Sequence, residues 1–518
     1  MATAIRDIER TYDPAAAGAA VSDAVRSMTG VAGVAAVAQQ TGQTLDALYY
    51  DTADLRLLRA GITLRRRAGG EDAGWCLKLP GCSGGDEILR PLGSRARAPE
   101  ARAPEARTLA SGQAGQPAVP KELAALVRAW ARGEGLEPVL HLRTTRGLLR
   151  LLDGAGRPLA EVMSDHVSAE PAGGSAATSW DEIEAALVNG HRGLLKAIDT
   201  RLRQAGARRV ATTGLERTLG SMLPAAEAPG VPALTERSPA GEVVLAYVRQ
   251  QVLAILRCDP LVRRDEPDAV HQMRVATRRA RSALQAFGQI VGREATRPLC
   301  DELKWLAATL GHARDAEVLL ARLTAELAAI PAALVVGPVK ARITGHFSAE
   351  LAQAGKAALR ALNGRRYLRL LDDLDRLLAD PPLTPRAQRR AGTALAKPVR
   401  RAARRLQRAL AAVPGAEDQD AAIHEARKAG KRARYAAEVA LPALGGKARR
   451  QAARTKKLQE VLGDHQDSVV ARAVLREIAD EARSAGEDTF SYGLVYGREA
   501  CQAAEIERAL PRLAARAR

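Results

Sequence analysis

One basic pattern occurs twice in the second half of the chain, and this repeat limits the folds that the segment can adopt. His271-Gln272-Met273-Arg274 leads into Arg278, Arg279 and Arg281, and His424-Glu425-Ala426-Arg427 leads into Lys431, Arg432 and Arg434. The basic residues follow each histidine at the same offsets, and the two histidines lie 153 residues apart. Offsets of 3, 7 and 10 residues fall on one stripe of an α-helix. The repeat therefore predicts a duplicated helical unit with two cationic helix faces.

A second pair of motifs recurs at nearly the same interval. Lys304-Trp305-Leu306 precedes Leu310-Gly311 and Arg314-Asp315, and Lys456-Lys457-Leu458 precedes Leu462-Gly463 and Gln466-Asp467, with the two Leu-Gly pairs 152 residues apart. No second carboxylate lies near Asp315 or Asp467 in the sequence, so we expect both to clamp neighbouring Arg or Lys side chains. Trp305 is expected to pack against the protein and not against a nucleic-acid base.

The charge is distributed unevenly along the 518 residues, a length that favours two or more domains. Residues 1–237 hold 29 Lys and Arg against 27 Asp and Glu, whereas residues 238–518 hold 49 against 32. Nearly all of the net charge of +19 therefore belongs to the second half, which should attract a polyanion.

The pattern of hydrophobic residues also changes along the chain. Residues 1–222 contain short alternating segments that predict strands, residues 223–240 are rich in Pro and Ala and predict a linker, and residues 241–518 have helical periodicity almost throughout. Gly445 and Gly463 are expected to break helices. The fold class is therefore α+β and multidomain, with a strand-rich first domain and an all-α second domain.

Composition excludes several classes of protein. Aromatic residues make up 3% of the chain, which disfavours single-stranded nucleic acid as a ligand because such binders stack bases on aromatic side chains. No apolar run reaches the length of a membrane span. The five cysteines are scattered and form no CxxC pair, so they indicate neither a disulfide framework nor a zinc site. A reducing cytoplasm is the expected compartment, and the oligomeric state stays open.

Alternative interpretations of the basic stripes remain. A single basic helix face is usually solvated. His271 and His424 could instead bind a metal ion, although their arginine-rich surroundings oppose a divalent cation. Few carboxylates lie on the stripes, so an external anion is the preferred partner, and arginine offers phosphate a forked pair of donors.

Together the segments 271–282, 304–315, 424–435 and 456–467 resemble the CHAD domain, the conserved histidine α-helical domain. The resemblance covers about residues 240–518. It implies two pseudo-symmetric four-helix bundles with a basic groove that binds inorganic polyphosphate. The implied binding residues are His271, Arg274, Arg278, Arg279, Lys304, Arg314, His424, Arg427, Lys428, Lys431, Arg432, Lys457 and His465, to which the stripes add Arg281 and Arg434. Gln466 stands where the first copy has Arg314, so weaker phosphate binding is expected at that position of the second copy.

The first 220 residues resemble the CYTH domain, the triphosphate tunnel metalloenzymes. The resemblance rests on Asp7-Ile8-Glu9-Arg10, Tyr49-Tyr50-Asp51-Thr52, Leu64-Arg65-Arg66-Arg67, Trp75-Cys76-Leu77-Lys78-Leu79 and Trp180-Asp181-Glu182-Ile183-Glu184. It implies a closed antiparallel β-barrel whose tunnel binds triphosphate through Arg65, Arg67, Lys78 and Arg143. The metal ligands that it implies for Mg²⁺ or Mn²⁺ are Asp7, Glu9, Glu161, Glu182 and Glu184.

Two departures from the CYTH pattern weaken the expectation of catalysis. Thr11 stands where the family has the lysine of Glu-x-Glu-x-Lys, and Ala186 stands where a further glutamate is usual. The leading hypothesis is therefore a polyphosphate-binding protein with a degenerate barrel, located in the cytoplasm and in polyphosphate granules. An active metal-dependent triphosphatase is the alternative, and a nucleic-acid binder is the third.

Overall fold

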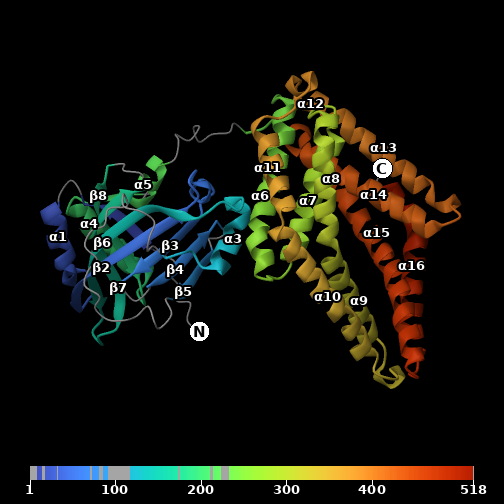
Figure 1. Cartoon of the computed structure of the whole chain (residues 1–518), viewed down its shortest axis with the longest axis horizontal. Coiled ribbons are helices and arrows are strands. Elements are labelled where there is room, and N and C mark those ends of the chain that lie inside the picture. Colours follow the sequence, from blue (N-terminus) through green and yellow to red (C-terminus); the bar gives the residue numbers. More distant parts are fainter. Residues whose placement is uncertain are drawn as a thin grey trace. The chain divides into compact units, whose positions relative to one another are not determined.

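The computed structural model describes residues 9–14, 18–31, 33–69, 73–80, 86–91, 117–172, 176–210, 214–222 and 233–516. The chain forms two compact units, Met1–Gly230 and Val231–Arg518 (Figure 1). The first unit holds the strands and the second is helical, which confirms the α+β, multidomain fold class. Asp7 and most of the predicted linker lie outside the described residues.

A single antiparallel sheet forms the first unit. Its strands are β1 (Glu9–Asp13), β2 (Ala36–Asp51), β3 (Thr63–Ala68), β4 (Gly74–Leu79), β5 (Asp86–Pro91), β6 (Glu137–Leu152), β7 (Pro158–Pro171), β8 (Thr178–Leu187) and β9 (Arg208–Val210). They lie in the order β5-β4-β3-β2-β6-β7-β8-β1-β9. Among the described residues the edge strands β5 and β9 each pair with one neighbour, so the sheet is open and not the closed barrel that we expected. The three-residue β9 is too short to offer a long edge for closure.

Helices cover one face of this sheet in two places. Near one edge, α1 (Gly18–Arg26) and α4 (Arg192–Gln204) pack over strand residues such as Leu151 and Val162. Toward the other edge, α2 (Arg56–Arg59) and α3 (Lys121–Ala131) cover Leu64 and Leu77. Because side chains alternate along a strand, the charged residues between these apolar positions lie on the opposite face.

The opposite face is apolar at one end and polar elsewhere. Leu219 of α5 (Gly214–Met222) packs there with Tyr49, Leu142 and Val167. We call this face, including all strand residues whose side chains point to it, the polar face of the sheet.

Helices account for the second unit. They are α6 (Ala240–Arg263), α7 (Ala269–Ala286), α8 (Arg293–Thr309), α9 (Gly311–Ala328), α10 (Val339–Asn363), α11 (Arg365–Ala379), α12 (Ala391–Ala394), α13 (Ala396–Ala411), α14 (Gln419–Val439), α15 (Leu441–Ser484) and α16 (Phe490–Arg516). The helix α7 packs between α6 and α8, and α14 packs between α13 and α15. The helices α7 and α14 also contact each other, so the two basic motifs occupy equivalent and adjacent positions (Figure 1).

Glycine positions test the predicted helix boundaries. Gly445 has a left-handed φ of 54° and kinks α15, as predicted. Gly463 was wrongly expected to end a helix, because α15 continues through it to Ser484. A Cβ at position 463 would lie 3.9 Å from Nε of Arg427, so this glycine sits where an arginine passes close to the helix. Among the described residues, no helix is both long and apolar enough to cross a membrane.

Candidate anion-binding site

The helices α7 and α14 present their basic residues beside small buried ones. Ala276 and Ala280 are buried on α7, whereas Ala426 and Ala433 of α14 are buried in a core with Leu458 of α15. The helices α7 and α14 contact each other, so the half-buried stripes that start at His271 and at His424 lie on neighbouring helices.

Four cations at the centre of this contact form what we call the cationic cluster: Arg274, Arg278, Arg427 and Lys431. Burial, followed by repulsion from Arg278, Arg427 and Arg274, lowers the pKa of Lys431 to about 6. Burial and the neighbouring Arg274 and Arg427 likewise lower the pKa of Arg278. Repulsion between side chains of different helices requires proximity, so basic residues of the two repeats lie close together.

Two aspartates lie at the edge of the cationic cluster. Arg274 donates to Asp315 at 2.8 Å, and a nitrogen of Arg427 lies 3.9 Å from an oxygen of Asp467. These pairs confirm the prediction that both aspartates clamp basic neighbours. Among the described residues, Arg278 and Lys431 form no ion pair with a carboxylate. The cluster is therefore only partly neutralised by the protein itself.

The two motif histidines differ in their surroundings. Nδ1 of His271 is buried without a hydrogen-bond partner in the described part of the chain. Burial and then Arg314 lower the pKa of His271. By contrast, Nδ1 of His424 lies within hydrogen-bonding distance of the side-chain oxygen of Gln466. Gln466, which replaces the arginine of the first copy, thus orients a histidine, a role that its sequence position did not reveal.

Two other predicted binding residues, Arg279 and Arg434, share a carboxylate of the protein as their partner. Glu438 lies 3.4 Å from Arg279 and accepts from Arg434 at 2.7 Å and from Tyr247 at 3.1 Å. Sequence reasoning missed Glu438, although its position four residues after Arg434 is the spacing of a helical ion pair.

Farther from the centre, the predicted cations are more exposed. Arg314 pairs with Glu317 at 3.1 Å, and Lys428 pairs with Glu425 at 2.7 Å. Arg281 is half-buried, whereas Lys304, Arg432 and Lys457 are exposed. Partial desolvation and then Arg405 of α13 lower the pKa of Arg432, so Arg405 is a further cation that the motifs did not indicate.

His465 lies away from the predicted anion site. It is 1% exposed and contacts Glu507 of α16 and Asp420 of α14. Its equivalent in the first copy is the buried Ala313, which indicates a position that faces the helix core in both repeats. Its assignment to phosphate binding is therefore not supported by its orientation.

The polar face of the sheet carries most of the other predicted residues. Arg65 pairs with Cys76 and Thr63 pairs with Lys78 across β3 and β4, so Arg65, Arg67 and Lys78 share a face. Arg65 donates to the hydroxyl of Tyr49 at 3.2 Å. Arg143, in contrast, has the opposite phase on β6 and lies 3.7 Å from Asp46 on the helix-covered face.

Arg146 and Arg150 lie on the polar face of the sheet, where we had expected Arg143. Arg146 donates to Asp165 at 2.5 Å and 2.8 Å, and Arg150 donates to Glu161 at 2.9 Å. Glu182 and Glu184 lie near enough to Arg146 to raise its pKa, although burial and Asp165 affect it more strongly. The alternation of β6 contained this signal, because Arg146 and Arg150 are in phase with Glu161 across the strands.

Several of the predicted metal ligands on the polar face already have protein partners. Glu161 accepts from Arg150, and Glu182 accepts from Trp180 at 3.0 Å. Glu9 lies in β1 opposite Ala186, and Asp7 is outside the described residues. Among the described residues, the three-residue group that could hold a metal ion is Asp420, His465 and Glu507, in the helical unit.

Two adjacent basic helices from duplicated motifs, following an open antiparallel sheet, define a two-domain class of protein. The family model of the CHAD domain matches residues 246–476, and the chain belongs to that family. The chain is 39% identical over 519 residues to the uncharacterized protein Rv2226 of Mycobacterium tuberculosis, covering 95% of this chain and 93% of that protein.

Solved structures resemble each unit separately. The CHAD domain from the plant Ricinus communis is 28% identical, with a TM-score of 0.45, and covers 56% of this chain and 97% of its own. The Hippeastrum protein HpAC1, described as a candidate adenylyl cyclase with a dominant triphosphatase activity, is 13% identical, with a TM-score of 0.26. That match covers 42% of this chain and 97% of HpAC1.

Proposed function

We propose that the helical unit binds inorganic polyphosphate through the cationic cluster and the basic residues around it. The observation that carries the proposal is a set of buried nitrogens without hydrogen-bond partners in the described part of the chain. Among the motif residues they are Nδ1 of His271 and Nε of Arg274, Arg279, Arg281, Arg314 and Arg427. Buried polar groups are normally hydrogen-bonded, so several such groups among the basic residues of the two repeats favour an external anion as the missing partner.

The chemistry of the cluster favours a phosphate polymer. Arg274 and Arg278 come from one repeat and Arg427 and Lys431 from the other, so an extended anion would contact both helices. Arginine offers phosphate oxygens forked donors, and buried repulsion among the four cations would be relieved by a polyanion. We therefore propose His271, His424 and the cationic cluster as the centre of the site. The flanking residues Arg281, Lys304, Arg314, Lys428, Arg432 and Lys457 would extend it.

Titration of the full chain with long-chain polyphosphate by calorimetry tests this proposal. Binding is expected to weaken steeply with salt, because each phosphate that the protein neutralises releases a counterion. The double variant R278Q/K431M should lose affinity and flatten the salt dependence. The matched control is R297Q, which removes an exposed arginine of α8 that pairs with Glu294 at 3.9 Å. Equal affinities of the double variant and the control would refute the proposal.

DNA competes for the same kind of charge and must be tested directly. Aromatic residues make up only 3% of the chain, whereas binders of single-stranded nucleic acid normally stack bases on them, so single-stranded DNA should displace polyphosphate poorly at equal phosphate concentration. Efficient displacement by DNA would favour nucleic acid as the ligand and count against polyphosphate.

We further propose that the sheet contacts phosphate weakly and is a degenerate triphosphatase. Arg65, Arg67 and Lys78 lie on the same face as Arg146 and Arg150, so this face presents several cations to an anion. However, Arg146 and Arg150 are held by Asp165 and Glu161, so a metal ion would compete with arginine for those carboxylates. When bound, Mg²⁺ or Mn²⁺ would polarise a phosphoryl group, and Glu161, Glu182 and Glu184 are the described residues that could hold it.

An active triphosphatase remains the alternative, and one assay separates the two. Phosphate release from tripolyphosphate is measured with Mg²⁺ or Mn²⁺ for the full chain and for E182Q/E184Q. A degenerate sheet predicts release near the uncatalysed rate in both proteins. Rapid, metal-dependent release that the double variant abolishes would establish the enzyme.

A further inference from the structure

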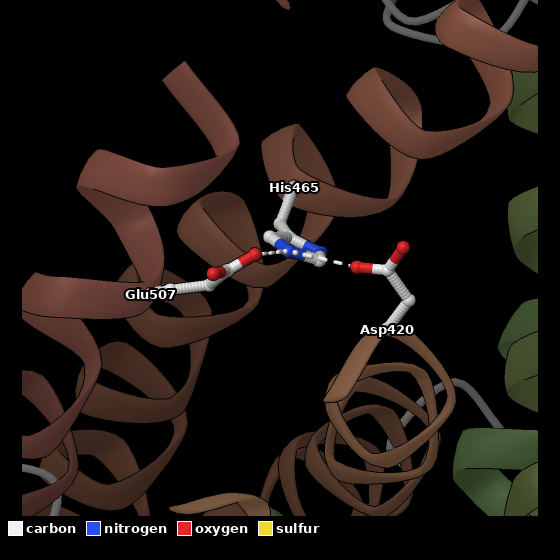
Figure 2. A group of neighbouring side chains, drawn as sticks. All are labelled: Asp420, His465 and Glu507. Carbon is white, nitrogen blue, oxygen red and sulfur yellow. Dashed lines mark hydrogen bonds and ion pairs between the residues drawn. The ribbon is translucent and has the colours of Figure 1, made fainter. Parts of the chain in front are cut away.

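Three side chains from three helices converge beside the first turn of α14 (Figure 2). Nε2 of His465, on α15, lies 3.0 Å from an oxygen of Glu507 on α16 and 3.4 Å from Oδ1 of Asp420 on α14. All three potential ligand atoms lie within 4.8 Å of one another. The histidine is almost completely buried, whereas both carboxylates are partly exposed.

The spacing of these atoms suits a shared cation. Ligand atoms bound about 2.1 Å from a metal ion lie roughly 3.0 Å apart at a right angle and roughly 3.4 Å apart at the tetrahedral angle. Both carboxylates approach the same ring nitrogen of His465, and this nitrogen can carry a single proton. One N–H bond cannot point directly at both oxygens, whereas both distances from this nitrogen suit ligands of one metal ion.

The surroundings keep the inward-facing oxygen of Asp420 available. Nη2 of Arg472 lies 3.6 Å from Oδ2 of Asp420, while Oδ1 faces His465. A partner on the second oxygen orients a carboxylate ligand without occupying its binding atom.

Comparison of the two copies of the internal repeat shows that this three-residue group is not part of the repeated basic motifs. At the repeat intervals of 153 and 152 residues, Pro267 corresponds to Asp420 and Ala313 corresponds to His465. The first copy therefore lacks two of the three side chains, although it keeps the basic stripe. Gln466, the next residue after His465, contacts His424 instead. His465 and Gln466, although adjacent on α15, thus belong to two different groups of side chains.

We propose that Asp420, His465 and Glu507 bind one divalent transition-metal ion, of the class of Zn²⁺ or Mn²⁺. One imidazole and two carboxylates match the preferences of these ions. Three protein ligands would leave positions for water. The ion would link α14, α15 and α16 and stabilise the turn that places Gln466 beside His424.

The test uses the full chain in the background E161Q/E182Q, which removes two carboxylates of the sheet. Chelator-stripped protein is titrated with Zn²⁺, Mn²⁺ or, as a visible probe, Co²⁺, and bound metal is counted by elemental analysis. We expect one equivalent of metal and a rise in the melting temperature of the chain. The variants D420N and E507Q, whose side chains are partly exposed and should not prevent folding, should lose affinity by about tenfold or more.

D464N is the matched control, because Asp464 is exposed on α15 beside His465 and outside the three-residue group. It should keep the metal, the Co²⁺ spectrum and the gain in melting temperature. If the parent binds none of the three metals, or if D420N and E507Q bind as tightly as D464N, the three side chains interact only with one another and the proposal is wrong.

Discussion

The guanidinium of Arg274 on α7 lies 2.8 Å from the carboxylate of Asp315 on α9, across the motif pair that the sequence repeats. At the equivalent place, Arg427 faces Asp467 at 3.9 Å. The glycine of each Leu-Gly pair lies beside the arginine: a Cβ on Gly311 would be 3.3 Å from a nitrogen of Arg274. The second motif of each repeat therefore places a carboxylate and a glycine beside an arginine of the first.

Replacing Asp315 should tighten polyphosphate binding. D315N removes a negative charge that competes with phosphate for Arg274. Because the Asp315 side chain is 63% exposed, we expect a gain of about 1 kcal/mol or less, which is at most about fivefold in affinity. Calorimetry with polyphosphate measures this change, with D301N, an exposed aspartate of α8, as control. A large loss of affinity would instead show that Asp315 holds Arg274 in its binding orientation.

Polyphosphate affinity should fall as pH rises from 6 to 9. The pKa of Lys431 is about 6 in the ligand-free protein, so this amine is mostly neutral above that pH. A bound anion favours the charged form, and binding at pH 8 should therefore take up a proton. Titrations in two buffers with different ionisation enthalpies measure this uptake. K431R, which stays protonated, should reduce the uptake, and an unchanged value would contradict the role of Lys431.

Replacing Lys431 with a neutral side chain should stabilise the ligand-free protein. Between pH 6 and 10.5 the unfolded chain holds a proton on Lys431 that the folded chain lacks, so stability rises with pH in this window. K431M removes this dependence. Its melting temperature at pH 7 should exceed that of the parent by about 2–6 °C, and the difference should shrink toward pH 10. Thermal unfolding by circular dichroism at both pH values tests this. A variant less stable than the parent at pH 7 would show that the lysine contributes favourable packing that outweighs its burial.

Arginines of opposite phase on β6 should differ in their effect on triphosphate binding by the sheet. R146Q removes a cation from the polar face, whereas R143Q removes one from the helix-covered face. Tripolyphosphate affinity is measured in the background R278Q/K431M, which weakens the helical site. R146Q should reduce the residual affinity and R143Q should leave it unchanged. The reverse result would place the anion on the other face of the sheet.

Much of the helical unit could be predicted from residue spacing. The repeat predicted that the stripes of His271 and His424 lie on equivalent helices, and α7 and α14 occupy such positions. The expectation for Gly463 failed because α15 continues through this buried glycine, and packing of the helix against its neighbours is not visible in the local sequence. Alternation located Arg65 and Arg67 on one face, but the family resemblance pointed to Arg143, which has the opposite phase to Arg146 on β6.

By itself, the sequence determined that two cationic helix faces exist and that the positive charge belongs to the second half of the chain, because both follow from residue order and helical geometry. The tertiary structure alone decided which cations meet. Arg278 and Lys431 converge without a paired carboxylate among the described residues, whereas Arg279 and Arg434 are paired with Glu438. Whether a cation is neutralised depends on distances of a few ångströms between helices. The packing of the helices likewise makes neighbours of Asp420, His465 and Glu507, which are far apart in the chain.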